Sequence, residues 1–245
     1  MPRTTVPMTA STTTHPTTTR PTTTRPTTTF ITSTLGLALL AGMLTHPGAA
    51  QAASPAPVAE TLPPFHAITI SPLIGLHFTQ GPTQNVSVTA PAPVLRHLRL
   101  SVHDGVLDVH TEGDLDDFSM NGHSILLTIT LPHLTRIDDS GLVHGTLDHL
   151  DAQNLTLNLS GAAELALQGQ IHNLTVTISG DSRIDARQLK IDNFTAHISG
   201  IGKIKANVTK SVTIDLSGVG HVTIHGNPPV RHIHTSGLGT VNFKP

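Results

Sequence analysis

The side chains with the widest chemical scope in this sequence are its 17 histidines, and one group of them follows a repeating pattern. His197, Asp215 and His234 lie 18 and 19 residues apart, and His232 falls on the same face, level with Thr213. If successive repeats stack, two imidazoles flank one carboxylate at about 4.8 Å per step, a ligand set that suits zinc or nickel. The alternative is an exposed polar column with a weak charge pair. Ligand type alone does not separate these two interpretations, so we assign no metal ligand.

The carboxylates do not form a promising acid–base pair. Asp138 and Asp139 are adjacent, and Asp116 and Asp117 lie in the acidic, loop-like segment 111–123. Neighbouring residues of a strand point to opposite faces, which separates carboxylates that would have to act together. No Ser-His-Asp order, Gly-rich phosphate loop or metalloprotease motif occurs. We therefore expect no enzyme, no catalytic residue and no cofactor; a β-helical polysaccharide lyase or hydrolase is the alternative.

The composition excludes several classes of partner and of chemistry. The chain has no Cys, Trp or Tyr, and Phe is its only aromatic residue. It can therefore form no disulfide, thiolate nucleophile or lipidated cysteine, and it lacks the rings that usually stack on sugars or bases. A net charge of -2 and a pI of about 6.8 argue against nucleic acid, because phosphate binding needs an excess of Lys and Arg.

The elements that would position these side chains come from an internal repeat. The dipeptide Ser-Gly occurs at spacings of 20, 19, 20, 18 and 19 residues. These dipeptides begin at Ser140, Ser160, Ser179, Ser199, Ser217 and Ser236. The residues on both sides of each dipeptide alternate apolar and polar with period two, which is typical of a strand with one buried face. Each unit is expected to hold two short strands and two corners, with no helix.

A unit of this length cannot bury its apolar face alone, so stacked neighbours must cover it. The fold class is therefore all-β: a short, right-handed parallel β-helix, or β-solenoid, of about 19-residue repeats. We expect the corner glycines to adopt positive φ. A second corner is expected to carry a polar column of Asn154, Asn173, Asn193 and Ser211. The strand that follows this corner is expected to carry an outward threonine ladder of Thr156, Thr175, Thr195 and Thr213. Glu164 with Arg183, and Asp185 with Lys205, would place opposite charges on adjacent coils, worth about 0–1 kcal/mol each.

The segment 65–131 is also rich in alternating runs but lacks the Ser-Gly period. Asp104 and Gly105 are the central residues expected for a type I′ hairpin turn. We interpret this segment as an N-terminal β-rich section that caps one end of the solenoid. The last coil, 236–245, would leave a strand edge open to end-to-end association.

The first 52 residues are typical of a secretory signal. A Thr/Pro-rich, Arg-containing stretch precedes the apolar run 30–44, and small residues follow with an A-x-A pattern that places cleavage between Ala52 and Ala53. The apolar run is shorter than the roughly 20 residues of a membrane span, although an uncleaved anchor, a misassigned start at Met1 or a mucin-like stalk are alternatives. Residues 53–64 are interpreted as a Pro/Ala linker and 65–245 as one domain.

Several short motifs follow one another along the chain in a fixed order. They are FHAITI (65–70), VSVTA (86–90), DGVLDV (104–109), ITLPHL (129–134), the Ser-Gly units, GNPPV (226–230) and SGLG (236–239). This order resembles the bacterial putative auto-transporter adhesin family with a head GIN domain. The resemblance covers about 65–245. It implies an exported envelope protein with a β-helix-like fold, and it brings no established activity and no catalytic residues. Many relatives look like lipoproteins with a cysteine at the cleavage site, which this chain lacks.

These observations favour a non-catalytic exported protein of the cell envelope, an adhesin or binding module that uses a polar strand face. The alternative is a structural or assembly component of the envelope that binds other proteins. The expected ligand is a glycan or an envelope protein, and neither nucleic acid nor a stable membrane span after cleavage is expected. The periplasm, the outer envelope surface and the medium remain open as locations.

Overall fold

The computed structural model describes residues 58–60, 62–112 and 125–245. The signal segment, its Ala52–Ala53 cleavage site and most of the linker lie outside these residues, as do Asp116 and Asp117. The strands are β1 (Val58–Glu60), β2 (Ala67–Ile70), β3 (Leu73–Gln80), β4 (Asn85–Thr89), β5 (Leu98–His103), β6 (Val106–Thr111), β7 (Ile125–Leu131), β8 (Arg136–Asp139), β9 (Leu142–Leu159), β10 (Ala162–Ile178), β11 (Asp181–Ile198), β12 (Ile201–Leu216), β13 (Val219–His225), β14 (Val230–Thr235) and β15 (Leu238–Lys244). The single helix in this part of the chain is α1 (Ala92–Leu95).

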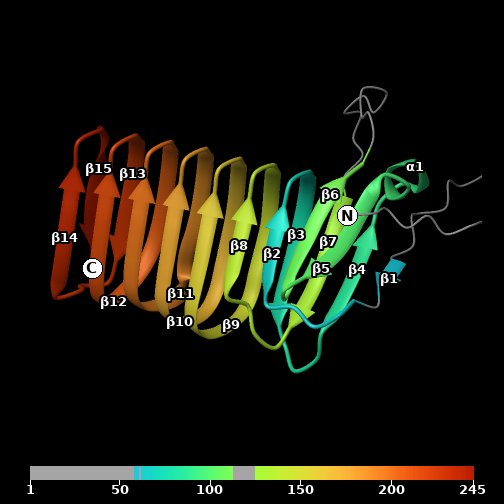
Figure 1. The fold of residues 1–245 in the computed structure, drawn as a ribbon. Coiled ribbons are helices and arrows are strands. Elements are labelled where there is room, and N and C mark those ends of the chain that lie inside the picture. Colours follow the sequence, from blue (N-terminus) through green and yellow to red (C-terminus); the bar gives the residue numbers. More distant parts are fainter. Residues whose placement is uncertain (1–57, 61, 113–124) are drawn as a thin grey trace, which may run out of the picture. The chain divides into compact units, whose positions relative to one another are not determined.

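The strands wind into a β-solenoid of about five turns, which confirms the predicted fold class (Figure 1). Two sheets face one another across the core. The front sheet runs β5-β6-β2-β8, then the second halves of β9 to β12, and ends with β14. The back sheet runs β1-β4-β7-β3, then the first halves of β9 to β12, and ends with β13 and β15. Each Ser-Gly corner carries the chain from the front sheet to the back sheet.

The repeat register follows the sequence alignment closely. Leu155, Leu174, Phe194 and Val212 stack in one inward column, and all four are buried. The repeat units differ from the prediction in one respect. Each of β9 to β12 is a single strand of 16 to 18 residues that bends at the second corner without a break.

The corner glycines are required for a reason other than the one expected. None of the Ser-Gly glycines in the described chain has a positive φ, so the prediction of a left-handed turn is wrong. The backbones of successive coils approach closely instead. A Cβ on Gly200 would lie 2.1 Å from the carbonyl oxygen of Gly180, and one on Gly180 would lie 1.8 Å from that of Gly161. A side chain at this corner would push the coils apart, which explains why glycine recurs.

The second corner is held by the predicted asparagine column. The Asn173 side-chain amide donates to Asn154 Oδ1 at 2.9 Å, and the Asn193 amide donates to Asn173 Oδ1 at 2.9 Å. The Ser211 hydroxyl continues the series by donating to Asn193 Oδ1 at 2.7 Å. Side-chain amides thus repeat the coil-to-coil pairing of the backbone.

The N-terminal section is more closely integrated than the sequence indicated. β2 and β3 form a coil of their own, with Ser71 and Pro72 at the corner, directly beneath Gly141. This coil lies between β6–β7 on one side and β8–β9 on the other, and all these pairings are parallel. The hairpin prediction is confirmed, since β5 and β6 pair antiparallel and Asp104 and Gly105 have φ of 51° and 73°.

Candidate functional site

The outer surface of the front sheet carries two in-register columns of polar side chains. Neighbouring coils pair Thr156, Thr175, Thr195 and Thr213 in register, as predicted. A second column, two positions along each strand, contains Asp138, Asn158, Thr177, His197, Asp215 and His234 in register. Both columns follow from strand alternation, because every second residue must point away from the core. The result is a sheet face of hydroxyl, amide, imidazole and carboxylate groups.

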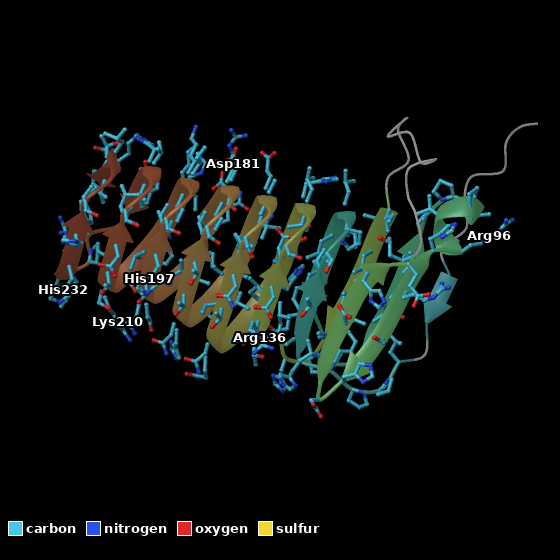
Figure 2. All side chains as sticks on the ribbon, turned by 45° about the horizontal axis from the view of Figure 1, so that its top comes forward. Arg96, Arg136, Asp181, His197, Lys210 and His232 are labelled. Atoms are coloured by element: carbon cyan, nitrogen blue, oxygen red, sulfur yellow. The ribbon has the colours of Figure 1, made fainter. Side chains whose placement is uncertain are left out.

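His197, Asp215 and His234, the alternative metal ligands that the sequence offered, lie in one column but are not arranged as a metal centre. His197 Nδ1 lies 3.0 Å from Asp215 Oδ2, and each of these side chains is 49% exposed. His234 follows Asp215 in register, and His232 lies beside Thr213 (Figure 2). Within the described residues, no group of three His, Cys, Asp or Glu side chains is arranged to hold a metal ion. The geometry favours the exposed polar column.

The adjacent carboxylates have separate structural roles. Asp138 accepts hydrogen bonds from Arg136 Nε and from the Asn158 amide, both at 2.7 Å, on the outer surface. Asp139 points inward and is 1% exposed, and its Oδ1 accepts a hydrogen bond from the Gly141 backbone N–H at 3.1 Å. Burial raises the pKa of Asp139 to about 6, because a charge in the core is poorly solvated. Two carboxylates on opposite sides of a sheet cannot act on the same bond.

A small polar depression lies along the second corner. Figure 2 shows Lys210 at this edge, opposite Asp181. Asp192 lines the depression. Its carboxylate accepts hydrogen bonds from Lys210 Nζ at 2.8 Å and from Thr209 Oγ1 at 2.9 Å, and it lies 2.8 Å from His172 Nδ1. These hydrogen bonds, above all that from Lys210, lower the pKa of Asp192 to about 2. The depression measures about 120 Å³, well below the roughly 300 Å³ at which small-molecule pockets begin.

Sequence reasoning missed this corner cluster. The Ser-Gly spacing does not reveal it, because the unit from Ser199 to Ser217 is the shortest, at 18 residues. Within that unit β12 nevertheless places two residues, Thr209 and Lys210, where β11 has only Asp192. The predicted Glu164–Arg183 pair does form, at 3.3 Å. Asp185 lies in register with Lys205, but its ion pair is with Arg187, at 2.6 Å.

The fold agrees with the comparisons with known proteins. The family model described as putative auto-transporter adhesin, head GIN domain, matches residues 64–228, more than half of the chain. The chain belongs to this family. No curated protein matches it.

Among solved structures, a putative adhesin from Bacteroides fragilis has a TM-score of 0.63, with 18% identity, over 77% of this chain and 96% of its own. A putative adhesin from Parabacteroides merdae has a TM-score of 0.43, with 16% identity, over 79% of this chain and 98% of its own. At such identities, the likeness to the B. fragilis protein shows the fold of the head GIN chain. No helix in the described residues is long and apolar enough to cross a membrane.

Proposed function

We propose that this head GIN protein is an exported, non-catalytic binding module of the cell envelope, and that its ligand lies across the outer face of the front sheet. The observation that carries the proposal is the pair of in-register polar columns from Thr156 to Thr213 and from Asp138 to His234. The adhesin descriptions of the family and of the B. fragilis structure support the same function.

The geometry of these columns suits an extended ligand with repeating polar groups. Neighbouring coils place equivalent hydroxyls about 4.8 Å apart, and each threonine hydroxyl both donates and accepts hydrogen bonds. A glycan chain, or an extended surface of an envelope protein, can therefore make the same weak contact several times. Several weak contacts on one ligand raise its overall affinity without a deep pocket.

A non-catalytic role is supported by the placement of the acids. Asp138 is held by Arg136 and Asn158, whereas Asp139 is inside the core. The Asp192 carboxylate is likewise occupied by Lys210, Thr209 and His172. None of these groups is paired with a second acid in the way that a lyase or glycoside hydrolase requires.

Export rests on the sequence of the first 52 residues, with its Arg-containing start, apolar run and A-x-A pattern. Expression of the full chain in a bacterial host, followed by N-terminal sequencing of the extracytoplasmic protein, tests this directly. We expect the mature chain to begin at Ala53. Retention of the intact chain in the cytoplasm would contradict export.

Binding is tested by screening the full exported chain against a glycan array and against envelope extracts. In the variant T175V/T195V the two hydroxyls are lost with little change in shape, and we expect the affinity for the selected ligand to fall about tenfold, from roughly 0.7 kcal/mol per hydrogen bond. T128V, an outward threonine of β7 in the back sheet, is the matched control. If the double variant and the native chain had equal affinity, the front sheet would be excluded as the ligand-binding surface. Turnover of a polysaccharide would overturn the non-catalytic proposal.

A further inference from the structure

A second surface, on the back sheet, differs in chemistry from the polar columns. A shallow groove of about 520 Å³ crosses β11, β12, β13 and β15 near the C-terminal end of the solenoid. It lies between the outward columns two and four residues past each Ser-Gly serine. Its lining includes Ile201, Val219 and Leu238 on one side, and Arg183, Lys203 and His221 on the other.

One wall of the groove is apolar and faces solvent. Ile201, Val219 and Leu238 pair in register on successive coils and are 54%, 50% and 75% exposed. Strand alternation places polar residues at most other outward positions of these coils, so three aliphatic side chains in one outward column are unusual. Covering them would remove apolar surface from water, at about 25 cal/mol per Å².

The other wall carries two cations, Arg183 and Lys203, and only Arg183 is paired with an acid of the described chain. Arg183 lies 3.3 Å from Glu164, and the Thr240 hydroxyl lies 2.6 Å from His221 Nδ1. Lys203, between them, makes no hydrogen bond or ion pair with any described residue. Its ammonium is therefore available to an anion at the end of the groove where Ile201 begins the apolar column.

The floor and width of the groove limit what can enter it. The floor is the backbone at Gly202, Gly220 and Gly239, which already pairs between coils. An added peptide strand would find no backbone partners there. The two walls lie two residues apart along each strand, about 6.6 Å, whereas an α-helix with its side chains is about 10 Å wide. A single extended hydrocarbon chain needs no backbone hydrogen bonds and is narrow enough to lie between the two walls.

We propose that this groove binds one molecule of a free, long-chain amphiphile with an anionic head, such as a fatty carboxylate. The hydrocarbon chain lies along Ile201, Val219 and Leu238, and the carboxylate is paired with Lys203. Asp181 is the next residue of the same outward column on the N-terminal side of Ile201, and its like charge repels the carboxylate toward Lys203. This site is independent of the proposed front-sheet function, because the two lie on opposite sheets.

The test is calorimetric titration of the full exported chain with laurate, the twelve-carbon carboxylate, below its micelle-forming concentration. We expect one saturable site. In I201T/V219T the affinity should fall about tenfold, because two aliphatic contacts are lost. L142T changes an exposed residue of the same outward column three coils away and should leave the affinity unchanged.

The charge is tested separately from the apolar wall. K203Q should weaken laurate binding about fivefold, whereas D181N should strengthen it, because it removes the opposing charge. Hexanoate, with too short a chain to span the column, should bind more weakly than laurate by at least tenfold.

Several outcomes would overturn the proposal: no saturable laurate binding, equal affinities of I201T/V219T and the native chain, or binding to phosphatidylglycerol vesicles without binding to free laurate. Circular dichroism of each variant establishes that it is folded. T175V/T195V should keep its laurate affinity, and I201T/V219T should keep the affinity for the front-sheet ligand. Failure of the groove proposal is thereby distinguished from failure of the binding-module proposal.

Discussion

The two ends of the solenoid differ: strands cover the N-terminal end, whereas the C-terminal end has an open strand edge. At the N-terminal end, antiparallel β4 pairs with β7, β1 pairs with β4, and β5 pairs with β6, so strands of opposite direction cover the last parallel coil. At the C-terminal end, within the described chain, β14 pairs only with β12 and β15 only with β13. All six residues of β14 are exposed, whereas Val86 and Val88 of β4 are buried. The first end is therefore covered by backbone pairing, and the second is not.

Side-chain chemistry takes the place of backbone pairing at the open end. Arg231 occupies the inward column that contains Val212 in the preceding coil. Its guanidinium lies 4.1 Å from the centre of the Phe243 ring, and its Nε donates to the Pro228 carbonyl at 3.0 Å. A charge on the inward side of an edge strand is a known obstacle to further strand addition. The difference teaches that a repeat fold needs a means of stopping at each end, and that the two means need not be alike.

The largest expected effect is the loss of stability when a corner glycine is replaced by alanine, which should differ between the interior and the open end. Gly200→Ala places a Cβ against the Gly180 carbonyl in the middle of the stack and should destabilise the fold by about 3 kcal/mol or more. Gly237→Ala makes the same clash with Gly218, but the last coil can shift outward, so the loss should be less than half as large. Urea unfolding of the two variants measures the difference. Equal losses would show that the end coil is as constrained as the interior.

A buried carboxyl near the covered end gives a pH-dependent effect. Asp139 has a pKa of about 6 in the fold and 3.8 as an exposed group, so the folded state holds an extra proton between these values. The free energy of unfolding is therefore highest below about pH 4, where Asp139 is protonated in both states, and it falls as the pH rises to about 6 and the buried carboxyl loses its proton. Asp139→Asn should raise the free energy of unfolding at pH 7 by up to about 3 kcal/mol and flatten this pH dependence. Chemical denaturation at pH 4 and pH 7 provides the check; a less stable variant at pH 7 would disprove the burial argument.

The open end is tested by removing its inward charge. Arg231→Val places an aliphatic residue in the inward column. It should allow the last coils of two molecules to associate, so that light scattering detects dimers at micromolar concentration. His232→Val changes an outward residue of the same strand and should remain like the native chain. If both variants behave alike, the inward position of the charge has no special role.

The smallest effect concerns the asparagine column. Asn173 bonds to asparagines on both sides, whereas Asn154 bonds to one. Replacement by alanine should cost about 1 kcal/mol at position 173 and about half as much at 154, because each lost bond is partly replaced by water. Thermal unfolding of the two variants gives the ratio. A larger loss at 154 would show that the column does not act through these bonds.

Much of the fold could be predicted because residues of the same type recur every 18 to 20 residues and therefore stack in columns. The asparagine and threonine columns pair as aligned, and the Ser-Gly corners stack on one another as aligned. The β2–β3 coil could not be found in this way, because its corner is Ser71-Pro72 and its partners lie in β7 and β9, far along the chain. The reason for the corner glycines was also out of reach, since a sequence does not distinguish a positive φ from a close approach of two backbones.

The candidate sites were predicted less fully than the fold. The His197–Asp215 contact follows from the repeat, but whether His234 completes a ligand set depends on side-chain directions that spacing does not determine. The groove does have a signal in the sequence, because Ile201, Val219 and Leu238 lie two residues past a Ser-Gly serine, where strand alternation makes them outward. The Asp192 cluster depends on an inserted residue at a corner, and only coordinates resolve its register.

Hydrogen–deuterium exchange of the full exported chain tests most directly whether the repeats stack as parallel coils with unlike ends. We predict that the amides of β10 and β11 exchange most slowly, that β4 is protected nearly as well, and that β14 and β15 exchange fastest among the strands. Uniform protection from β4 to β15, or slower exchange in β14 than in β4, would contradict a solenoid that is covered by strands at one end and left open at the other.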